Sequence, residues 1–270
     1  MIDKDTTFLL GAQDPEMREI ERVVRDAGLA ALHAARGGRR CDARTAYLAD
    51  AVVRVGADGV ARAAVLRPAL PFVEVECTLD GRVPACRVDH HRPGDPGFEA
   101  PPEDFLRGAS LGQVLALLER EATPTQRLLA AGDHCLTAAY AGRCPGVAPD
   151  ELLFLRASWK ARISGRSLTD VVDGIQDAAR RARGRLDAEH GEARFLDPTE
   201  VPGDLPEGAA YAGVPVRYRD LLRDGTLKEM FKGGTPAAVE AFMAEHRRAG
   251  RVVYGNPWRG YAGAYDAAFR

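Results

Sequence analysis

Short apolar runs alternate with longer amphipathic stretches along the N-terminal half of the chain. Apolar runs of strand length cover residues 8–12, 30–35, 46–55, 61–66, 71–77 and 84–88. Apolar positions at helical spacing cover residues 15–27, 110–121 and 125–142. Strands interleaved with helices predict an α/β domain over residues 1–150, in which helices flank a mostly parallel sheet.

The pattern changes after residue 150. A capping box at Ser167 and Asp170 begins a run with helical spacing that extends to Leu186. We expect this helix to bridge two domains, as part of a helical linker over residues 151–190. Residues 191–270 then give strands, a tight glycine turn and a capped helix, which predicts a smaller α+β domain that binds substrate.

Composition and charge limit the classes of function. The 270 residues carry a formal net charge of -2, and the scattered Lys and Arg do not favour a long nucleic acid as partner. We expect a cytoplasmic protein without membrane contact, because no signal peptide and no apolar run of about 18 residues is present. The five cysteines form no C-x-x-C pair and are expected to be buried thiols. A homodimer is left open.

Carboxylates and imidazoles stand at four places along the predicted elements. They are Asp14 and Glu16 after the first strand, Glu76 at the end of the run at 71–77, Asp89, His90 and His91 after the run at 84–88, and Asp133 and His134 within the helix at 125–142. Ligands bind beyond the carboxyl ends of parallel strands, where the first three groups are expected to meet and which the fourth could reach from its helix. Carboxylates with imidazole suit Mn²⁺, Mg²⁺, Fe²⁺ or Zn²⁺.

Each group also has a purely structural interpretation. Asp14 is explained by an N-cap at the helix whose first residue is Pro15, and Glu76 by a surface acid at a strand end. Asp133 and His134 would satisfy each other or a neighbouring turn in a partly buried helix. The segment at 89–91 would then be a polar loop.

The run VDHH at residues 88–91 resembles the signature of the DHH phosphoesterase superfamily, which includes manganese-dependent pyrophosphatases, exonucleases and cyclic-dinucleotide phosphodiesterases. Asp14 and Glu16 are similar to its first motif, Glu76 stands in the place of its second, and Asp133 in that of its fourth. Glu replaces Asp at two of these positions, and Leu10 stands where the family has histidine. The resemblance covers residues 6–140.

The resemblance implies a role for each of these residues. It implies that Asp14, Glu16, Glu76, His90 and Asp133 hold a divalent metal, with manganese first among the candidates. Asp89 would orient its neighbours, His91 would contact a substrate oxygen, and Arg92 would assist. Substrate contacts are expected from His134 and from Lys232, Gly233, Gly234 and Thr235, in a glycine turn that is loosely similar to the family's GGGH loop but lacks its histidine. Apart from the resemblance, Asn256 and Arg259 of the segment at 254–265 are expected to line a small pocket. The structural alternatives are a plain strand-to-helix turn and a final strand that packs its aromatic residues.

The leading hypothesis is therefore a metal-dependent hydrolase, a phosphoesterase acting on a small phosphorylated or nucleotide-like substrate held between two domains. Two alternatives remain open. One is a metal-free ligand-binding or regulatory protein that kept the sheet. The other is a metal-dependent hydrolase of a carbon–nitrogen or ester bond.

Overall fold

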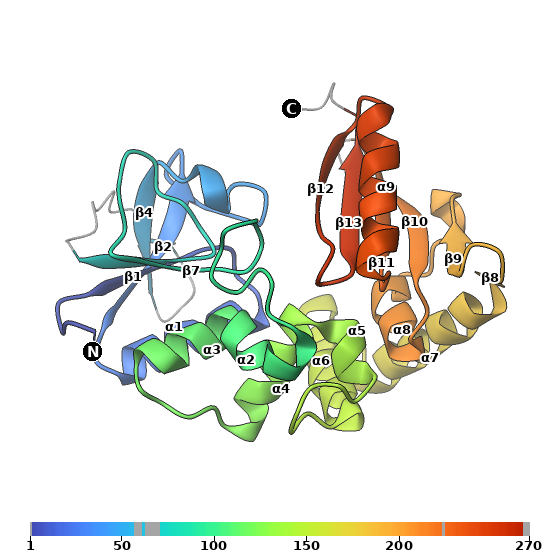
Figure 1. Ribbon diagram of the computed structural model, residues 1–270. Coiled ribbons are helices and arrows are strands. Elements are labelled where there is room, and N and C mark those ends of the chain that lie inside the picture. Colours follow the sequence, from blue (N-terminus) through green and yellow to red (C-terminus); the bar gives the residue numbers. More distant parts are fainter. Residues whose placement is uncertain (1, 57–60, 63–70, 223–224, 267–270) are drawn as a thin grey trace. The chain divides into compact units, whose positions relative to one another are not determined.

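The computed structural model describes residues 2–56, 61–62, 71–222 and 225–266 of the chain (Figure 1). It divides into two compact units, Met1–His134 and Cys135–Arg270, and each is a mixture of helices and one sheet. Within the described residues, no helix has the length and apolar character that crossing a lipid bilayer requires.

The sheet of the first unit is mixed, with its parallel strands side by side. Its strands are β1 (Thr7–Leu10), β2 (Ala30–Arg36), β3 (Arg39–Arg40), β4 (Ala51–Val55), β5 (Ala61–Arg62), β6 (Phe72–Val75) and β7 (Cys86–Val88). They lie in the order β5-β4-β2-β1-β6-β7, and β3 pairs with β2. The consecutive strands β2, β1, β6 and β7 pair parallel to one another, whereas β4 pairs antiparallel with β2 and β5 antiparallel with β4. The predicted parallel sheet thus forms only the part of the sheet that carries β2, β1, β6 and β7.

Helices cover one face of this sheet (Figure 1). They are α1 (Pro15–Asp26), α2 (Phe105–Gly108), α3 (Ser110–Leu117) and α4 (Pro124–His134), with 3₁₀ turns at Ala46–Leu48 and Pro102–Asp104. Phe8 and Leu10 of β1 pack with α1 and α3, whereas Leu9 packs into a second core on the opposite face. Successive side chains of β1 therefore point to opposite faces of the sheet, as in any strand, and both faces are buried.

Two predicted elements of the first unit differ from the structure. The run at 46–55 is a 3₁₀ turn followed by β4. Of the run predicted at 61–66, residues 61–62 form β5, and residues 63–66 lie outside the described residues. The helix predicted at 125–142 is two helices, α4 and α5 (Leu136–Tyr140), because Cys135 leaves the helical region at φ -150 and ψ 53. Asp133 therefore lies at the end of a helix and not in its interior.

The second unit is built on a largely antiparallel sheet. Its helices are α5, α6 (Pro149–Ser164), α7 (Leu168–Gly184), α8 (Leu205–Ala212) and α9 (Pro236–Arg248), with a 3₁₀ turn at Pro198–Glu200. Its strands are β8 (Leu186–Asp187), β9 (Glu192–Phe195), β10 (Val216–Leu221), β11 (Leu227–Lys232), β12 (Val252–Asn256) and β13 (Tyr261–Tyr265). They lie in the order β12-β13-β11-β10-β9-β8, and only β9 and β10 are parallel among these pairs.

Neighbouring residues of β11 point to opposite faces of the second sheet. Met230 packs with a core that includes Ala182 of α7 and Ala209 of α8, and Phe231 packs with Val239 of α9. The long helix expected to bridge two domains is α7, and it packs on α8 within this unit. Its apolar face is thus explained by the core of the second unit.

Candidate metal centre

The site lies at the carboxyl ends of three neighbouring parallel strands of the first unit. Asp14 and Glu16 begin the helix after β1, Glu76 directly follows β6, and the segment at 89–91 directly follows β7. Since β6 lies between β1 and β7 and is parallel to both, these groups share one edge of the sheet. The end of α4 adds Asp133 and His134.

Four of the residues assigned to a metal on sequence grounds converge in space. Glu16, Glu76, His90 and Asp133 each offer a donor atom, and all four atoms lie within 4.8 Å of one another. Nε2 of His90 lies 3.1 Å from Oδ2 of Asp133 and 3.3 Å from Oε1 of Glu76. His91 also comes within this range of Glu76 and His90.

The carboxylates of this cluster fit a cation. Oε1 of Glu16 accepts a hydrogen bond from the backbone N–H of Leu111 at 3.0 Å, whereas its buried Oε2 and the buried Oε1 of Glu76 accept none from the described residues. Burial, followed by the negative charges of Asp133 and Glu76, raises the pKa of Glu16 well above its ordinary value. A buried acid surrounded by acids is stable in ionised form only with a compensating positive charge.

Asp14 caps a helix and lies close to the acids of the cluster. Its Oδ1 accepts a hydrogen bond from the backbone N–H of Met17 at 2.7 Å, which caps α1. Burial, and then the charges of Asp133 and Glu76, raise its pKa to about 8. Asp14 therefore lies near the cluster, but it is outside the group of four converging donors.

Asp89 fixes the second histidine of the DHH run. Its Oδ1 lies 2.9 Å from Nδ1 of His91 and accepts hydrogen bonds from the backbone N–H groups of His90 and His91. The Tyr47 hydroxyl donates to the same carboxylate at 2.9 Å. Burial alone would raise the pKa of Asp89, but the hydrogen bonds from His91 and Tyr47 outweigh it and the pKa is lowered. Asp89 is thus an ionised residue that orients His91.

Arg92 lies against Tyr47. The centre of its guanidinium group is 3.6 Å from the centroid of the Tyr47 ring, which is a cation–π contact. Tyr47 therefore positions both Asp89 and Arg92.

His134 lies next to His90 and is 1% exposed. Its Nε2 lies 3.0 Å from the carbonyl oxygen of Ala100, and its Nδ1 lies 3.1 Å from Nδ1 of His90. Both ring nitrogens of His134 are engaged by protein atoms. These contacts place His134 against His90, and the expected contact of His134 with substrate stays a prediction.

The backbone at Glu76 is strained. Glu76 has a φ of 50°, in the left-handed region that side chains other than glycine rarely adopt. The turn passes so close to the end of β1 that a Cβ on Gly11 would overlap the carbonyl oxygen of Glu76. The Glu76 carboxylate thus reaches the cluster from a turn that has an unfavourable φ and that packs closely against Gly11.

The residues expected to bind substrate in the second unit surround the turn between β11 and α9. The N–H groups of Gly233 and Gly234 both donate to the carbonyl oxygen of Gly260, at 2.8 and 3.3 Å. The Thr235 hydroxyl caps α9. These groups are engaged within the protein, which leaves the side chain of Lys232 as the group of this turn best suited to an anion.

Lys232 lies close to Lys228 and Arg156, and also to the acid Glu207, which pairs with Arg156. Burial, followed by the charges of Lys228 and Arg156, lowers the pKa of Lys232. Asn256 accepts hydrogen bonds from the backbone of Trp258 and Arg259 with its side-chain oxygen. Its side chain thus holds the turn after β12.

Two residues of the site carry no local sequence signal. Tyr47 contacts Asp89 from a 3₁₀ turn that is 42 positions away in the chain. Gln113 of α3 donates from Nε2 to the carbonyl oxygen of Asp89 at 3.1 Å and to that of Gly108 at 2.7 Å. An isolated Tyr or Gln in an apolar run does not distinguish a site residue from an ordinary surface residue.

Comparison with protein-family models gives no match for this chain, and comparison with curated proteins gives none either. The chemistry of the site is therefore inferred from its own residues.

Proposed function

We propose that the protein is a divalent-metal-dependent phosphohydrolase that acts on a small phosphorylated or nucleotide-like substrate. The observation that carries this proposal is the convergence of Glu16, Glu76, His90 and Asp133, whose donor atoms lie within 4.8 Å of one another. Three carboxylates and one imidazole are a donor set typical of Mn²⁺, and also compatible with Mg²⁺, Fe²⁺ or Zn²⁺.

These four residues would hold the metal, with Asp14 nearby. When bound, a divalent ion lowers the pKa of water and neutralises charge that develops on a phosphoryl group. Side chains next to the metal would position the phosphoryl group of the substrate.

His91 and Arg92 are the proposed substrate contacts. Asp89 accepts the Nδ1 proton of His91, which fixes the ring, and Nε2 of His91 is the nitrogen proposed to exchange a proton with the reacting oxygen. Arg92, stacked on Tyr47, supplies a guanidinium that matches the geometry of phosphoryl oxygens. Lys232 remains a proposed contact for a phosphate of the substrate.

A turnover assay tests the proposal. Metal-stripped protein is supplied with Mn²⁺, Mg²⁺, Fe²⁺ or Zn²⁺ and assayed with a nitrophenyl phosphomonoester, a nitrophenyl phosphodiester and nitrophenyl acetate. We expect metal-dependent cleavage of a phosphoester that Asp133→Asn and Glu76→Gln abolish. The matched control is Glu119→Gln, because Glu119 is an exposed acid at the end of α3. Cleavage of the acetate alone would identify a non-phosphate hydrolase, and no turnover with any metal would contradict the proposal.

A further inference from the structure

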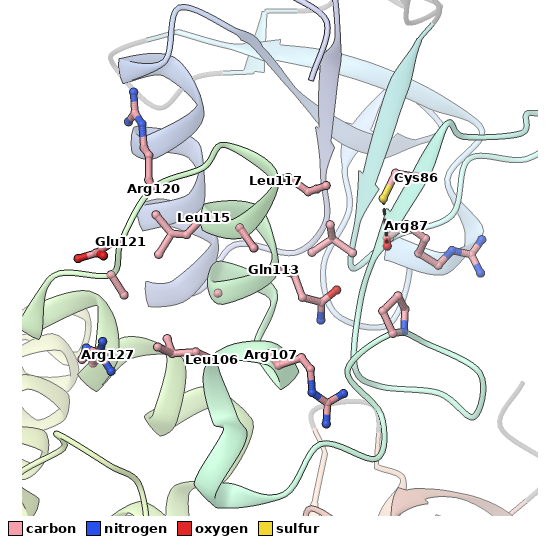
Figure 2. A pocket seen from close by; sticks show the side chains of 15 residues that line it. Cys86, Arg87, Leu106, Arg107, Gln113, Leu115, Leu117, Arg120, Glu121 and Arg127 are labelled. Atoms are coloured by element: carbon pink, nitrogen blue, oxygen red, sulfur yellow. Dashed lines mark hydrogen bonds between the residues drawn. The ribbon is translucent and has the colours of Figure 1, made fainter. Parts of the chain in front are cut away.

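A separate pocket of about 760 Å³ lies in the first unit (Figure 2). Its walls come from β7, α2, α3 and the start of α4, and it shares no residue with the group of four converging metal donors. Pockets of this volume are in the range that holds a small organic molecule.

The floor of the pocket is apolar. Figure 2 shows Leu106 and Leu115 facing the cavity from α2 and α3, with Leu117 nearby. Val88 of β7 and Ala116 of α3 complete this surface. A ligand that covers it gains from removal of apolar surface from water.

The rim of the pocket is positively charged. Arg87, Arg107, Arg120 and Arg127 line it, against one acid, Glu121. Carboxylates outside the lining neutralise two of the arginines, because Arg87 pairs with Glu74 and Arg107 pairs with Asp104.

Arg120 and Arg127 keep their positive charge at the pocket. Among the described residues, the side chain of Arg120 donates to the backbone carbonyls of Val23 and Asp26, at 3.4 and 3.3 Å, and to no carboxylate. The half-buried side chain of Arg127 has no hydrogen bond or ion pair with any residue that the structure describes. Arg127 is thus a cation placed beside an apolar surface without a carboxylate of its own.

We infer that this pocket binds a small organic anion, a molecule with an apolar body and a carboxylate, sulfonate or phosphate group. The apolar body covers Leu106 and Leu115, and the anionic group pairs with Arg127. A guanidinium binds such oxygens through two parallel N–H groups.

The pocket is joined to the metal centre by one side chain. Gln113 lines the pocket, and it also donates to the carbonyl oxygen of Asp89. A ligand in the pocket therefore contacts the residue that holds the start of the DHH segment.

The test uses full-length protein in the presence of a chelator, so that it does not depend on the metal centre. The probe is 1-anilinonaphthalene-8-sulfonate, an aromatic sulfonate whose fluorescence rises in apolar surroundings. We expect saturable binding at one site. Arg127→Met should weaken it about tenfold, the effect of one lost charge-assisted contact. Ala116→Trp should also weaken it, because the exposed Ala116 lines the pocket and a larger side chain fills it.

The matched control is Arg183→Met, because Arg183 is an exposed arginine of α7 in the second unit. The Arg183→Met variant should bind the probe with the same affinity as the wild type. Displacement by naphthyl phosphate, but not by naphthol or by inorganic phosphate, would support a site that needs both an apolar body and a charge. Equal probe affinity in wild type, Arg127→Met and Ala116→Trp, or absence of saturable binding, would overturn the inference. Melting curves of the variants verify that each is folded.

Discussion

The Nδ1 atoms of His90 and His134 lie 3.1 Å apart. The carbonyl oxygen of Ala100 only accepts hydrogen bonds, so Nε2 of His134 carries its hydrogen. With both rings neutral, Nδ1 of His134 is then an acceptor and Nδ1 of His90 is the donor. This arrangement leaves the lone pair of His90 on Nε2, the atom that faces Asp133 and Glu76.

His134 is therefore predicted to be a positioning residue. His134→Leu removes the acceptor for His90 and should weaken Mn²⁺ binding about 10- to 100-fold, as loss of hydrogen-bonded support for a metal ligand commonly does. His134→Gln keeps an acceptor and should recover much of the affinity. Calorimetric titration with Mn²⁺ measures both variants, and equal weakening by Leu and Gln would show that only packing matters.

The two histidines of the DHH segment should separate binding from turnover. His90→Ala removes a donor of the cluster and should abolish bound metal. His91→Ala removes a side chain held by Asp89 and should keep metal while lowering kcat by about 100-fold or more, the usual contribution of a proton-transfer group. Metal content of the purified variants, measured beside turnover, checks this. Identical metal content in both variants and wild type would contradict the assignment.

The backbone conformation of Glu76 is predicted to lower the free energy of unfolding, while its side chain contributes to metal binding. Its φ of 50° costs about 1 kcal/mol or more in a residue other than glycine. Glu76→Gly should therefore raise the free energy of unfolding of the metal-free protein by about 1 kcal/mol and abolish metal binding. Denaturant unfolding in the presence of a chelator measures the stability.

Glu119 provides the control for this prediction, because it also has a positive φ, of 54°, but is exposed at the end of α3. Glu119→Gly should stabilise the protein without any change in metal affinity. A Glu76→Gly variant that is less stable than wild type, or that still binds metal, would be contrary to the prediction.

The pair formed by Glu21 and His33 predicts a pH dependence of stability away from the site. Oε1 of Glu21 lies 3.3 Å from Nε2 of His33, and this hydrogen bond is the main cause that lowers the pKa of Glu21 from 4.5 to about 2. The unfolded chain therefore takes up a proton at Glu21 before the folded protein does. The stabilisation is present above pH 4.5 and is lost as the pH falls toward 2.

Glu21→Gln should accordingly lower the free energy of unfolding by about 0.5–1 kcal/mol at neutral pH. The difference between variant and wild type should shrink as the pH falls from 4.5 toward 2. Denaturant unfolding over a series of pH values measures it, and Glu240→Gln, at an exposed position of α9, is the control. A difference that is constant with pH would exclude the ionised carboxylate of Glu21 as its cause.

The sequence was sufficient to find the main residues of the cluster. Glu16, Glu76 and His90 follow apolar runs that form neighbouring parallel strands, so their proximity depends on topology that apolar patterning predicts. Asp14 caps α1, as its sequence context indicates, and its carboxylate is also close enough to Asp133 and Glu76 for their charges to raise its pKa.

Other features depend on contacts that sequence patterns do not encode. The antiparallel pairing of β4, the end of α4 at Cys135 and the contact of Tyr47 with Asp89 are set by packing between distant segments. Leu10 stands where the resemblance has histidine, and it is buried in the apolar core with Met17 and Leu111. The site of this protein therefore lacks an imidazole at that position.

The most direct test of the proposed centre is the anomalous scattering of manganese in a crystal of the protein grown with Mn²⁺. We predict an anomalous difference peak within bonding distance of carboxylate oxygens of Glu16, Glu76 and Asp133 and of Nε2 of His90. A crystal of Asp133→Asn grown in the same way should show no such peak. Crystals of the wild type that contain Mn²⁺ in solution but show no peak among these four residues would contradict the account.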